Sequence, residues 1–293
     1  MINDAINNMH HFVTTIAGCH QGQRKSGVEY GYTAFLSQIA NYQNSMIFND
    51  FRNDEYFADP IYGSHVMGNN IVDAVKSAPS TSMITLGGDH TISYGTIAAS
   101  TKIYPNVKVI WIDAHPDVNT PESSLSGNCH GMPVAYLLGL ATKSRLPDGP
   151  VISKKDIVYV GLRSIDHFEQ KLLDDSEIKY FTADKIKKVG IKKVLAEIND
   201  YWSLENEENP AKIHISLDID SMDPEFTPAT GTPVPNGLTP NDVKEVISFA
   251  NNHSQGSHAN LDITEVNPDL SDITGVCKTY KVCANIIDHY LHK

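Results

Sequence analysis

The chain has 293 residues, of which 41% are hydrophobic and 20% are charged, and this composition argues against a disordered protein. Its 35 acidic and 23 basic residues give a formal net charge of −12, which makes nucleic acids and anionic membranes unfavourable partners. The sequence shows no secretory signal pattern at its start and no apolar run of the roughly 20 residues that a membrane helix needs. Because its four cysteines are scattered, without a C-x-x-C pair, we expect reduced thiols and a cytoplasmic protein.

Short apolar runs alternate with helical patterns along the chain. The strand candidates, in chain order, are Phe12–Ala17, Met83–Leu86, Val107–Ile112, Ile157–Leu162, Ile178–Phe181, Ile213–Ile219 and Ala259–Glu265. Several of these runs are almost continuously apolar, which is typical of strands that are covered on both faces. The helix candidates are Ile71–Ser77, Thr91–Thr101, Pro133–Leu140, His167–Leu173, Ile191–Tyr201, Pro240–Asn251 and Cys277–Leu291.

This alternation predicts an α/β fold with three layers, in which a mainly parallel sheet lies between two layers of helices. No linker, repeat or low-complexity tract divides the sequence, so we expect residues 1–293 to form a single domain. In a sheet of this kind the ligand crevice lies beyond the carboxyl ends of the strands. The glycine- and proline-rich stretches 127–133 and 223–240 are therefore interpreted as ordered loops of a ligand site.

Acidic and histidine residues gather where apolar runs end. The clusters are Gly87–His90, Asp113–Asp117, Ser126–Gly131 and Ser216–Asp220, followed later by Glu265. Ionised groups taken out of water cost several kcal/mol each unless they are paired. Any one cluster could be a turn with a solvated acid or a helix cap, but their recurrence at strand ends favours a shared positive charge. We therefore expect a metal centre.

The clusters supply four carboxylates and two imidazoles as candidate metal ligands: His90, Asp113, His115, Asp117, Asp218 and Asp220. Side chains two residues apart on a strand point to the same face, so the members of each cluster can converge. Two metal ions bridged by shared carboxylates use such a set naturally. Carboxylate-rich sites suit Mn²⁺, although Co²⁺, Fe²⁺ and Ni²⁺ stay possible. Asp89 and Asp262 are expected to support neighbouring residues rather than to bind metal.

These motifs resemble those of the ureohydrolases, the manganese enzymes that include arginases and agmatinases. The matching blocks are Gly87–His90, Asp113–Asn119, Ser126–Val134, Ser216–Thr232 and Asp262–Pro268. Within that family, Ser126–Gly131 and Thr227–Pro233 are most similar to arginases. The resemblance implies an arginase-like α/β/α fold and two Mn²⁺ per subunit. It also implies that Asp113 and Asp218 bridge the two ions.

The resemblance further implies roles for individual residues. One ion would be held by His90, Asp113, Asp117 and Asp218, and the other by Asp113, His115, Asp218 and Asp220. The implied catalytic residues are Asp117, His130 and Glu265, and the implied substrate-binding residues are Asn119, Ser126, His130, Asp166, Glu169 and Glu265. A carboxylate suits a planar guanidinium, and an imidazole suits proton transfer near neutral pH. For His130 a structural role in its loop is the alternative, and for Glu169 a solvated helix charge.

The implied function is arginase activity, the hydrolysis of a C–N bond of a linear amidine. A hydroxide that bridges the metals would convert L-arginine to L-ornithine and urea, in a homotrimer or homohexamer. The alternatives are an agmatinase or another hydrolase of guanidino substrates, and a non-catalytic member of the fold. Four residues depart from the family pattern: Tyr32, Pro116, Cys129 and Ser164. Of these, Pro116 affects the metal site most directly, because a proline could reshape the loop that carries Asp117.

Overall fold

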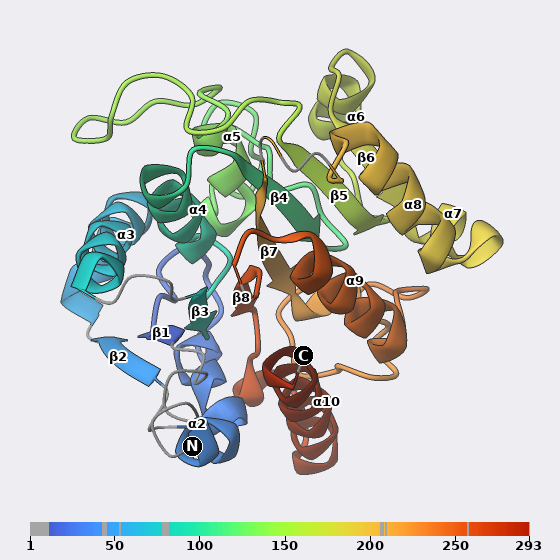
Figure 1. Ribbon diagram of the computed structural model, residues 1–293. Coiled ribbons are helices and arrows are strands. Elements are labelled where there is room, and N and C mark those ends of the chain that lie inside the picture. The colour runs from blue at the N-terminus through green and yellow to red at the C-terminus, as the bar shows by residue number, and fades with distance from the viewer. Residues whose placement is uncertain are drawn as a thin grey trace, which may run out of the picture.

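The computed structural model describes residues 12–42, 46–52, 54–77, 82–205, 208, 210–256 and 258–292. Within these residues one sheet of eight parallel strands has the order β2-β1-β3-β8-β7-β4-β5-β6 (Figure 1). The strands are β1 Phe12–Ala17, β2 Met46–Phe51, β3 Ser82–Leu86, β4 Val107–Ile112, β5 Ile157–Leu162, β6 Lys179–Thr182, β7 Lys212–Asp218 and β8 Asn260–Thr264. The parallel sheet predicted from the sequence is confirmed.

The seven predicted strands are present within one or two residues, but β2 was not predicted. This strand lies at the edge of the sheet and pairs only with β1. Asn49 and Asp50 interrupt its apolar pattern, and Ile47 and Phe48 are exposed. An edge strand is covered on fewer sides than a central one, so its sequence carries a weaker signal.

The helices follow the predicted order. Their bounds are α2 Leu36–Tyr42, α3 Pro60–Ser77, α4 Ile92–Ile103, α5 Pro133–Leu137, α6 His167–Asp174, α7 Ala183–Val189, α8 Ile191–Trp202, α9 Pro240–His253 and α10 Ile273–Leu291. Short 3₁₀ helices are η1 Val28–Phe35, η3 Asp54–Phe57, η4 Cys129–Gly131, η5 Ile219–Ser221 and η6 Pro268–Leu270. The sequence analysis did not predict α2 and α7. Among the described residues, no helix is both long enough and apolar enough to cross a membrane.

Helix α3 begins well before the predicted start at Ile71. Its first half contains Gly63 and Gly68, which in a sequence lower the helix signal. The structure gives these glycines a packing role, because a Cβ on Gly68 would lie only 2.2 Å from the carbonyl oxygen of Gly95 in α4. The two helices therefore pack backbone to backbone, and this contact outweighs the low helix propensity of glycine.

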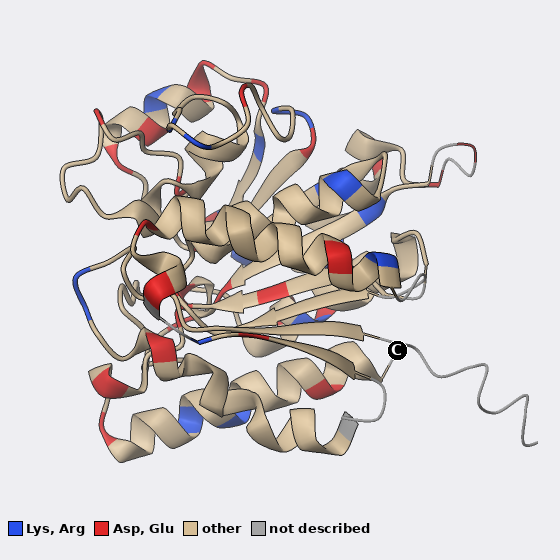
Figure 2. Ribbon diagram, turned by 90° about the vertical axis from the view of Figure 1, so that its left-hand side faces the viewer, with Lys and Arg blue, Asp and Glu red and all other residues tan. Residues whose placement is uncertain are grey.

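The helices cover both faces of the sheet, and Figure 2 shows the strands nearly edge-on between them. The buried side chains of β4 alternate accordingly. Val109 and Trp111 pack with residues of α4 and α5, whereas Ile110 and Ile112 pack with residues of α8, α9 and α10. This alternation is the expected period of two in a strand, and it confirms the predicted three-layer arrangement.

The centre of the sheet brings four strand ends together. Strands β3, β8, β7 and β4 are consecutive neighbours, and all run in the same direction. The residues that follow them are His90, Glu265, Asp220 and Asp113, in that order across the sheet. The topology therefore concentrates the predicted clusters at one edge.

The buried centre of the sheet should dominate the free energy of unfolding. Ile215 on β7 is fully buried, so Ile215→Ala is expected to lower the free energy of unfolding in urea by about 2–5 kcal/mol. The matched control is Ile273→Ala at the start of α10, where the side chain is 76% exposed and a change within about 0.5 kcal/mol is expected. Similar losses for both variants would contradict this account of the core.

Candidate metal centre

His90 lies at the centre of the predicted cluster. It follows β3 through Gly87 and Gly88, whose positive φ angles of 88° and 81° turn the chain sharply. A Cβ on Gly87 would lie 2.9 Å from the backbone nitrogen of Tyr32, so the turn also needs a residue without a side chain. Tyr32, one of the departures from the family pattern, thus contacts this turn through its backbone.

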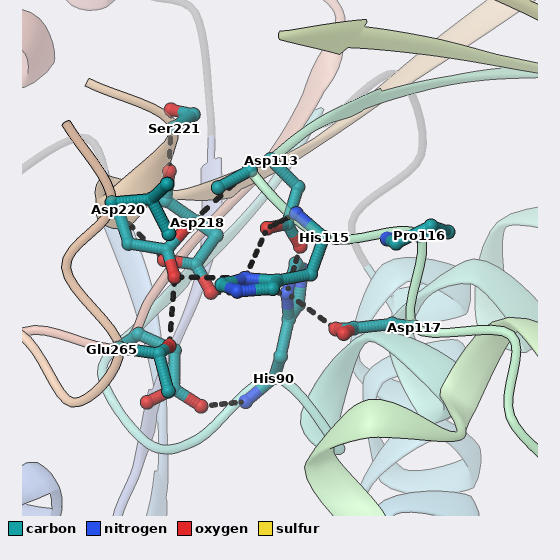
Figure 3. A network of polar contacts seen from close by, with 12 residues as sticks. His90, Asp113, His115, Pro116, Asp117, Asp218, Asp220, Ser221 and Glu265 are labelled. Atoms are coloured by element: carbon teal, nitrogen blue, oxygen red, sulfur yellow. Dashed lines mark hydrogen bonds and ion pairs between the residues drawn. The ribbon is translucent and has the colours of Figure 1, made fainter. Parts of the chain in front are cut away.

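The imidazole of His90 faces three carboxylates. Its Nδ1 lies 3.0 Å from Asp113 Oδ2, 3.1 Å from Asp117 Oδ2 and 3.3 Å from Asp218 Oδ2 (Figure 3). The ring stacks on Trp111, with 4.1 Å between the ring centroids and 15° between the planes. Because the ring is completely buried, its position is set by this packing and not by solvent.

A second group of possible ligands shares one carboxylate with the first. His115 Nδ1 lies 3.1 Å from Asp220 Oδ2 and 3.5 Å from Asp113 Oδ1. Ligand atoms of His90, Asp113 and Asp218 lie within 4.8 Å of one another, and so do those of Asp113, His115 and Asp220. Asp113 thus presents one oxygen to each histidine, the arrangement that a bridging ligand requires.

The electrostatics of the centre show that its carboxylates need a positive charge beside them. Burial opposes a charge on His90 and on His115, but the surrounding carboxylates outweigh it and raise the pKa of both imidazoles well above the ordinary value. Burial, followed by the charge of Asp113, raises the pKa of Asp117 to about 6. Burial and the neighbouring acids also raise the pKa of Asp218. The metal-free protein thus retains protons where cations would otherwise balance the acids.

The donor set fits a pair of metal ions. His90 Nδ1 is buried and makes no hydrogen bond, although three carboxylate oxygens surround it. A lone pair and carboxylate oxygens are all acceptors, so only a proton or a cation between them removes their mutual repulsion. The two adjoining groups together offer two imidazoles and three carboxylates, and Asp117 adds a fourth carboxylate beside His90. Nitrogen and oxygen ligands of this kind suit divalent metal ions.

Pro116 does not displace its neighbour. Asp117 adopts a left-handed backbone conformation, with φ of 50°, and its carboxylate still reaches His90. The carbonyl oxygen of Pro116 accepts a hydrogen bond of 2.8 Å from the hydroxyl of Tyr159 on β5. A non-glycine residue in the left-handed region is strained, and strain of this kind is commonly found at functional sites.

A cavity opens beside the centre. The residues that line it are His115, Asp117, Asn119, His130, Gly131, Ser164, Asp166, Glu169, Asp218 and Thr232. The structure therefore places three predicted ligands, and four of the residues predicted to bind substrate, around one space. Ser164, which departs from the family pattern, also lines it.

One wall of the cavity is the start of α6. Asp166 caps this helix, since its Oδ1 accepts from the backbone N–H of Glu169 and the Oε2 of Glu169 accepts from the backbone N–H of Asp166. The other Asp166 oxygen accepts from Asn119 Nδ2 at 2.6 Å. Glu169 is only 5% exposed, so it is not the solvated helix charge that the sequence left open.

Glu265 contacts both His130 and the backbone of His90. Its Oε1 accepts from the backbone N–H of His90 at 2.9 Å and lies 3.1 Å from His130 Nδ1. Its Oε2 accepts from Gln23 Nε2 at 2.8 Å. Burial opposes a charge on His130, but Glu265 outweighs it and raises the pKa of the imidazole to about 9. These contacts make the two side chains one ion pair at the edge of the centre.

Ser126 is not brought to the cavity. Its side chain is exposed and lies within hydrogen-bonding distance of Ser124 and of the backbone N–H of Asn128, on the outer part of the loop. Cys129 is half-buried, and burial raises the pKa of its thiol. The described conformation thus gives Ser126 no contact with the site.

Three residues of the site were missed by the sequence analysis. Gln23 holds Glu265, and Thr232 donates to Asp220 Oδ2 at 2.8 Å. Arg163 donates to the carbonyl oxygens of Asp220, Ser221, Met222, Val234 and Pro235, and so holds both ends of the loop after β7. Only the place of Thr232 in the motif Thr227–Pro233 was a signal for any of them.

Comparison with known proteins identifies the family. Residues 14–292 match the sequence profile of the Arginase family. Arginase-1 of Bos taurus is 42% identical over 209 residues, which cover 69% of this chain and only 62% of the bovine chain. The arginase of Bacillus subtilis is 30% identical with a TM-score of 0.84, over 97% of this chain and 99% of that chain. The arginase of Entamoeba histolytica, solved in complex with L-ornithine, is 34% identical with a TM-score of 0.80, over the same shares of the two chains.

The match includes every part of the candidate centre. The profile begins within β1 and ends in the last residues of the chain, so it covers all the strand ends that carry candidate ligands. The two solved arginases share the fold over 97% of the chain. The chain belongs to the arginase family.

Proposed function

We propose that the protein is an arginase that hydrolyses L-arginine to L-ornithine and urea with two Mn²⁺ per subunit. The observation that carries the proposal is the pair of adjoining ligand groups that share Asp113, beside a cavity lined by polar residues. Membership of the arginase family supports it. The Entamoeba histolytica arginase, solved with L-ornithine, supports the identity of the product.

The chain's own residues define what the metal pair would do. His90, Asp113, Asp117 and Asp218 would hold one ion, and His115 and Asp220 would complete the set for the other. When bound, two Mn²⁺ lower the pKa of water and supply hydroxide near neutral pH. Asp117 lines the cavity at the edge of this set, where its carboxylate can orient a water molecule toward the substrate.

Glu265 would bind the guanidinium group. Its carboxylate is buried beside His130, which lines the cavity, and is held at both oxygens, so it is positioned before substrate arrives. A planar cation meets such a carboxylate through charge-assisted hydrogen bonds. A guanidinium arriving there would replace His130 as the partner of Glu265.

His130 would carry protons between the site and solvent. Its side chain is partly exposed and lines the cavity, so it reaches both the substrate and water. Before substrate arrives, the ion pair with Glu265 keeps the imidazole protonated at neutral pH, and a guanidinium on Glu265 would weaken the hold of the ring on that proton. It can therefore donate a proton to the leaving amine, which is the step that releases ornithine.

The amino-acid end of the substrate would contact the wall formed by Asn119, Asp166 and Glu169. Asn119 offers an amide donor for a carboxylate, and Asp166 offers an acceptor for an ammonium group. Agmatine lacks the carboxylate, so these residues favour L-arginine over the agmatinase alternative. The single domain, the homotrimer or homohexamer and the cytoplasmic location remain predictions from the sequence.

The first prediction from this proposal concerns the choice between L-arginine and agmatine. The Mn²⁺-loaded protein should release urea from L-arginine faster than from agmatine. Asn119→Ala should raise KM for L-arginine about tenfold, because a hydrogen bond to a charged group contributes about 1.5 kcal/mol or more. KM for agmatine should rise much less, because agmatine has no carboxylate and would feel the change only through Asp166. Faster turnover of agmatine by the unmodified protein, or an equal effect of the substitution on both substrates, would contradict this assignment.

The second prediction concerns metal content. Asp113→Asn removes a charge shared by both ligand groups, so Mn²⁺ per chain should fall from two to one or fewer after loading and desalting, as measured by elemental analysis. The rate of urea release should fall at least about a hundredfold. Asp184→Asn, on the exposed surface of α7, is the control and should keep both ions. Two retained ions in the Asp113 variant would show that this carboxylate is not shared.

The third prediction concerns Glu169, whose pKa burial raises to about 8. The folded metal-free protein keeps this proton up to about pH 8, whereas the unfolded chain loses it near pH 4.3, so stability falls as pH rises between these values. Glu169→Gln cannot titrate. The free energy of unfolding of the wild type relative to this variant, measured in urea with EDTA, should fall by about 1.4 kcal/mol per pH unit from pH 5 to 8. A difference that is constant with pH would contradict the buried proton.

A further inference from the structure

A buried series of hydroxyl, carboxylate and imidazole groups lies between α4 and the sheet, next to the candidate metal centre. On β7 and β8, Ser216 pairs with Asp262 in register, so their side chains lie on the same face of the sheet. Helix α4 packs on this face, where Ser93 and Thr96 contact Asp262. All four side chains are at most 1% exposed. Polar groups this deep persist only where each has a partner.

The hydrogen bonds among these groups form a directed series that ends at His90. Ser93 Oγ donates to Asp262 Oδ2 at 3.0 Å, so the Ser93 oxygen is left as an acceptor. The Ser216 hydroxyl donates to that oxygen at 2.8 Å. Since its only proton is then used, Ser216 Oγ must accept the hydrogen bond of 2.9 Å that joins it to His90 Nε2.

The series therefore decides which nitrogen of His90 carries the proton when the ring is neutral. Nε2 donates to Ser216, and the lone pair is left on Nδ1, the atom that faces Asp113, Asp117 and Asp218. A serine alone could not decide this, because a hydroxyl beside an imidazole nitrogen can donate or accept equally well. The direction comes from Asp262, a carboxylate that accepts from Ser93.

We propose that Ser93 is a positioning residue for the metal centre, which acts through Ser216 to hold His90 in the tautomer that binds metal through Nδ1. The proposal rests on the proposed function in that it requires a metal ion on His90. Asp262 is the fixed end of this series of hydrogen bonds, which we call the relay. Its Oδ2 is also held by Thr96 and by His214 Nε2, the latter at 3.0 Å.

Without the Ser93 hydroxyl, Ser216 would be free to rotate. Its proton could then point to His90 Nε2, which would favour the tautomer with the proton on Nδ1, facing the carboxylates. Metal binding would then require the proton to leave Nδ1 of His90. Partners that orient a metal ligand commonly change metal affinity by about 10- to 100-fold. The effect should fall on the ion held by His90 and spare the one held by His115.

The test is a titration of the metal-free protein with Mn²⁺, in which calorimetry measures the affinity of each binding event. Ser93→Ala is expected to weaken one of the two binding events about tenfold or more and to leave the other unchanged. Ser216→Ala, at the next bond of the relay, should do the same, and the double variant should lose no more than Ser216→Ala alone. The matched control is Ser82→Ala, a buried serine at the start of β3, whose hydroxyl donates to the carbonyl oxygen of His258 and touches no member of the relay. It should bind both ions with wild-type affinity.

The melting temperature of each metal-free variant separates positioning from a loss of packing. Ser93→Ala should melt close to Ser82→Ala, since both remove one buried hydroxyl. Wild-type affinity for both ions in Ser93→Ala, or an equal loss in Ser82→Ala, would overturn the relay. A wild-type protein that binds fewer than two Mn²⁺ would instead overturn the proposed metal centre, whatever the variants do.

Discussion

The structure depends on the repulsion among four carboxylates that the fold holds out of water. Asp113, Asp117, Asp218 and Asp220 all lie at the ends of central parallel strands, and each is nearly or fully buried. An arrangement of this kind is unfavourable unless positive charge enters it. The two imidazoles accept that charge as protons in the metal-free protein, and metal ions would supply it more completely. Without a bound cation, the centre thus lowers the stability of the fold.

Much of this was predictable from the sequence, because the relevant signals are local. A strand end is marked by an apolar run followed by polar residues, and parallel topology then brings such ends to one edge. His90, Asp113 and Asp218 could be placed in this way without knowledge of the strand order. The capping pattern of α6 was equally local, although its use by Asp166 and Glu169 to build a wall of the cavity was not.

Other features could not be read from the sequence, because they depend on contacts between distant segments. Gln23 holds Glu265 across 242 positions of the chain, and nothing near Gln23 indicates this. The early start of α3 required the knowledge that Gly68 packs against Gly95. Ser126 was predicted from a motif to bind substrate, yet the described loop turns its side chain outward, because a motif specifies residue order and not the path of the loop. The proline in the central cluster was expected to reshape the loop, but Asp117 still meets His90.

The hydrogen bond from the backbone of His90 to Glu265 joins the candidate metal ligands and the proposed guanidinium site into one unit. A further backbone bond, from Glu265 to the carbonyl of Gly88, makes the same connection in the opposite direction. The other end of the cavity is made of the start of α6 and of loop residues, and it is joined to this unit by the hydrogen bond from the backbone N–H of Val118 to Glu169 Oε1. The residues proposed for metal and guanidinium binding mostly follow strand ends, whereas those proposed for the amino-acid end of the substrate lie on a loop and at a helix start. Val118, next to Asp117, is the point at which the two groups meet, so a change in the substrate wall would be felt at the candidate metal centre through this one bond.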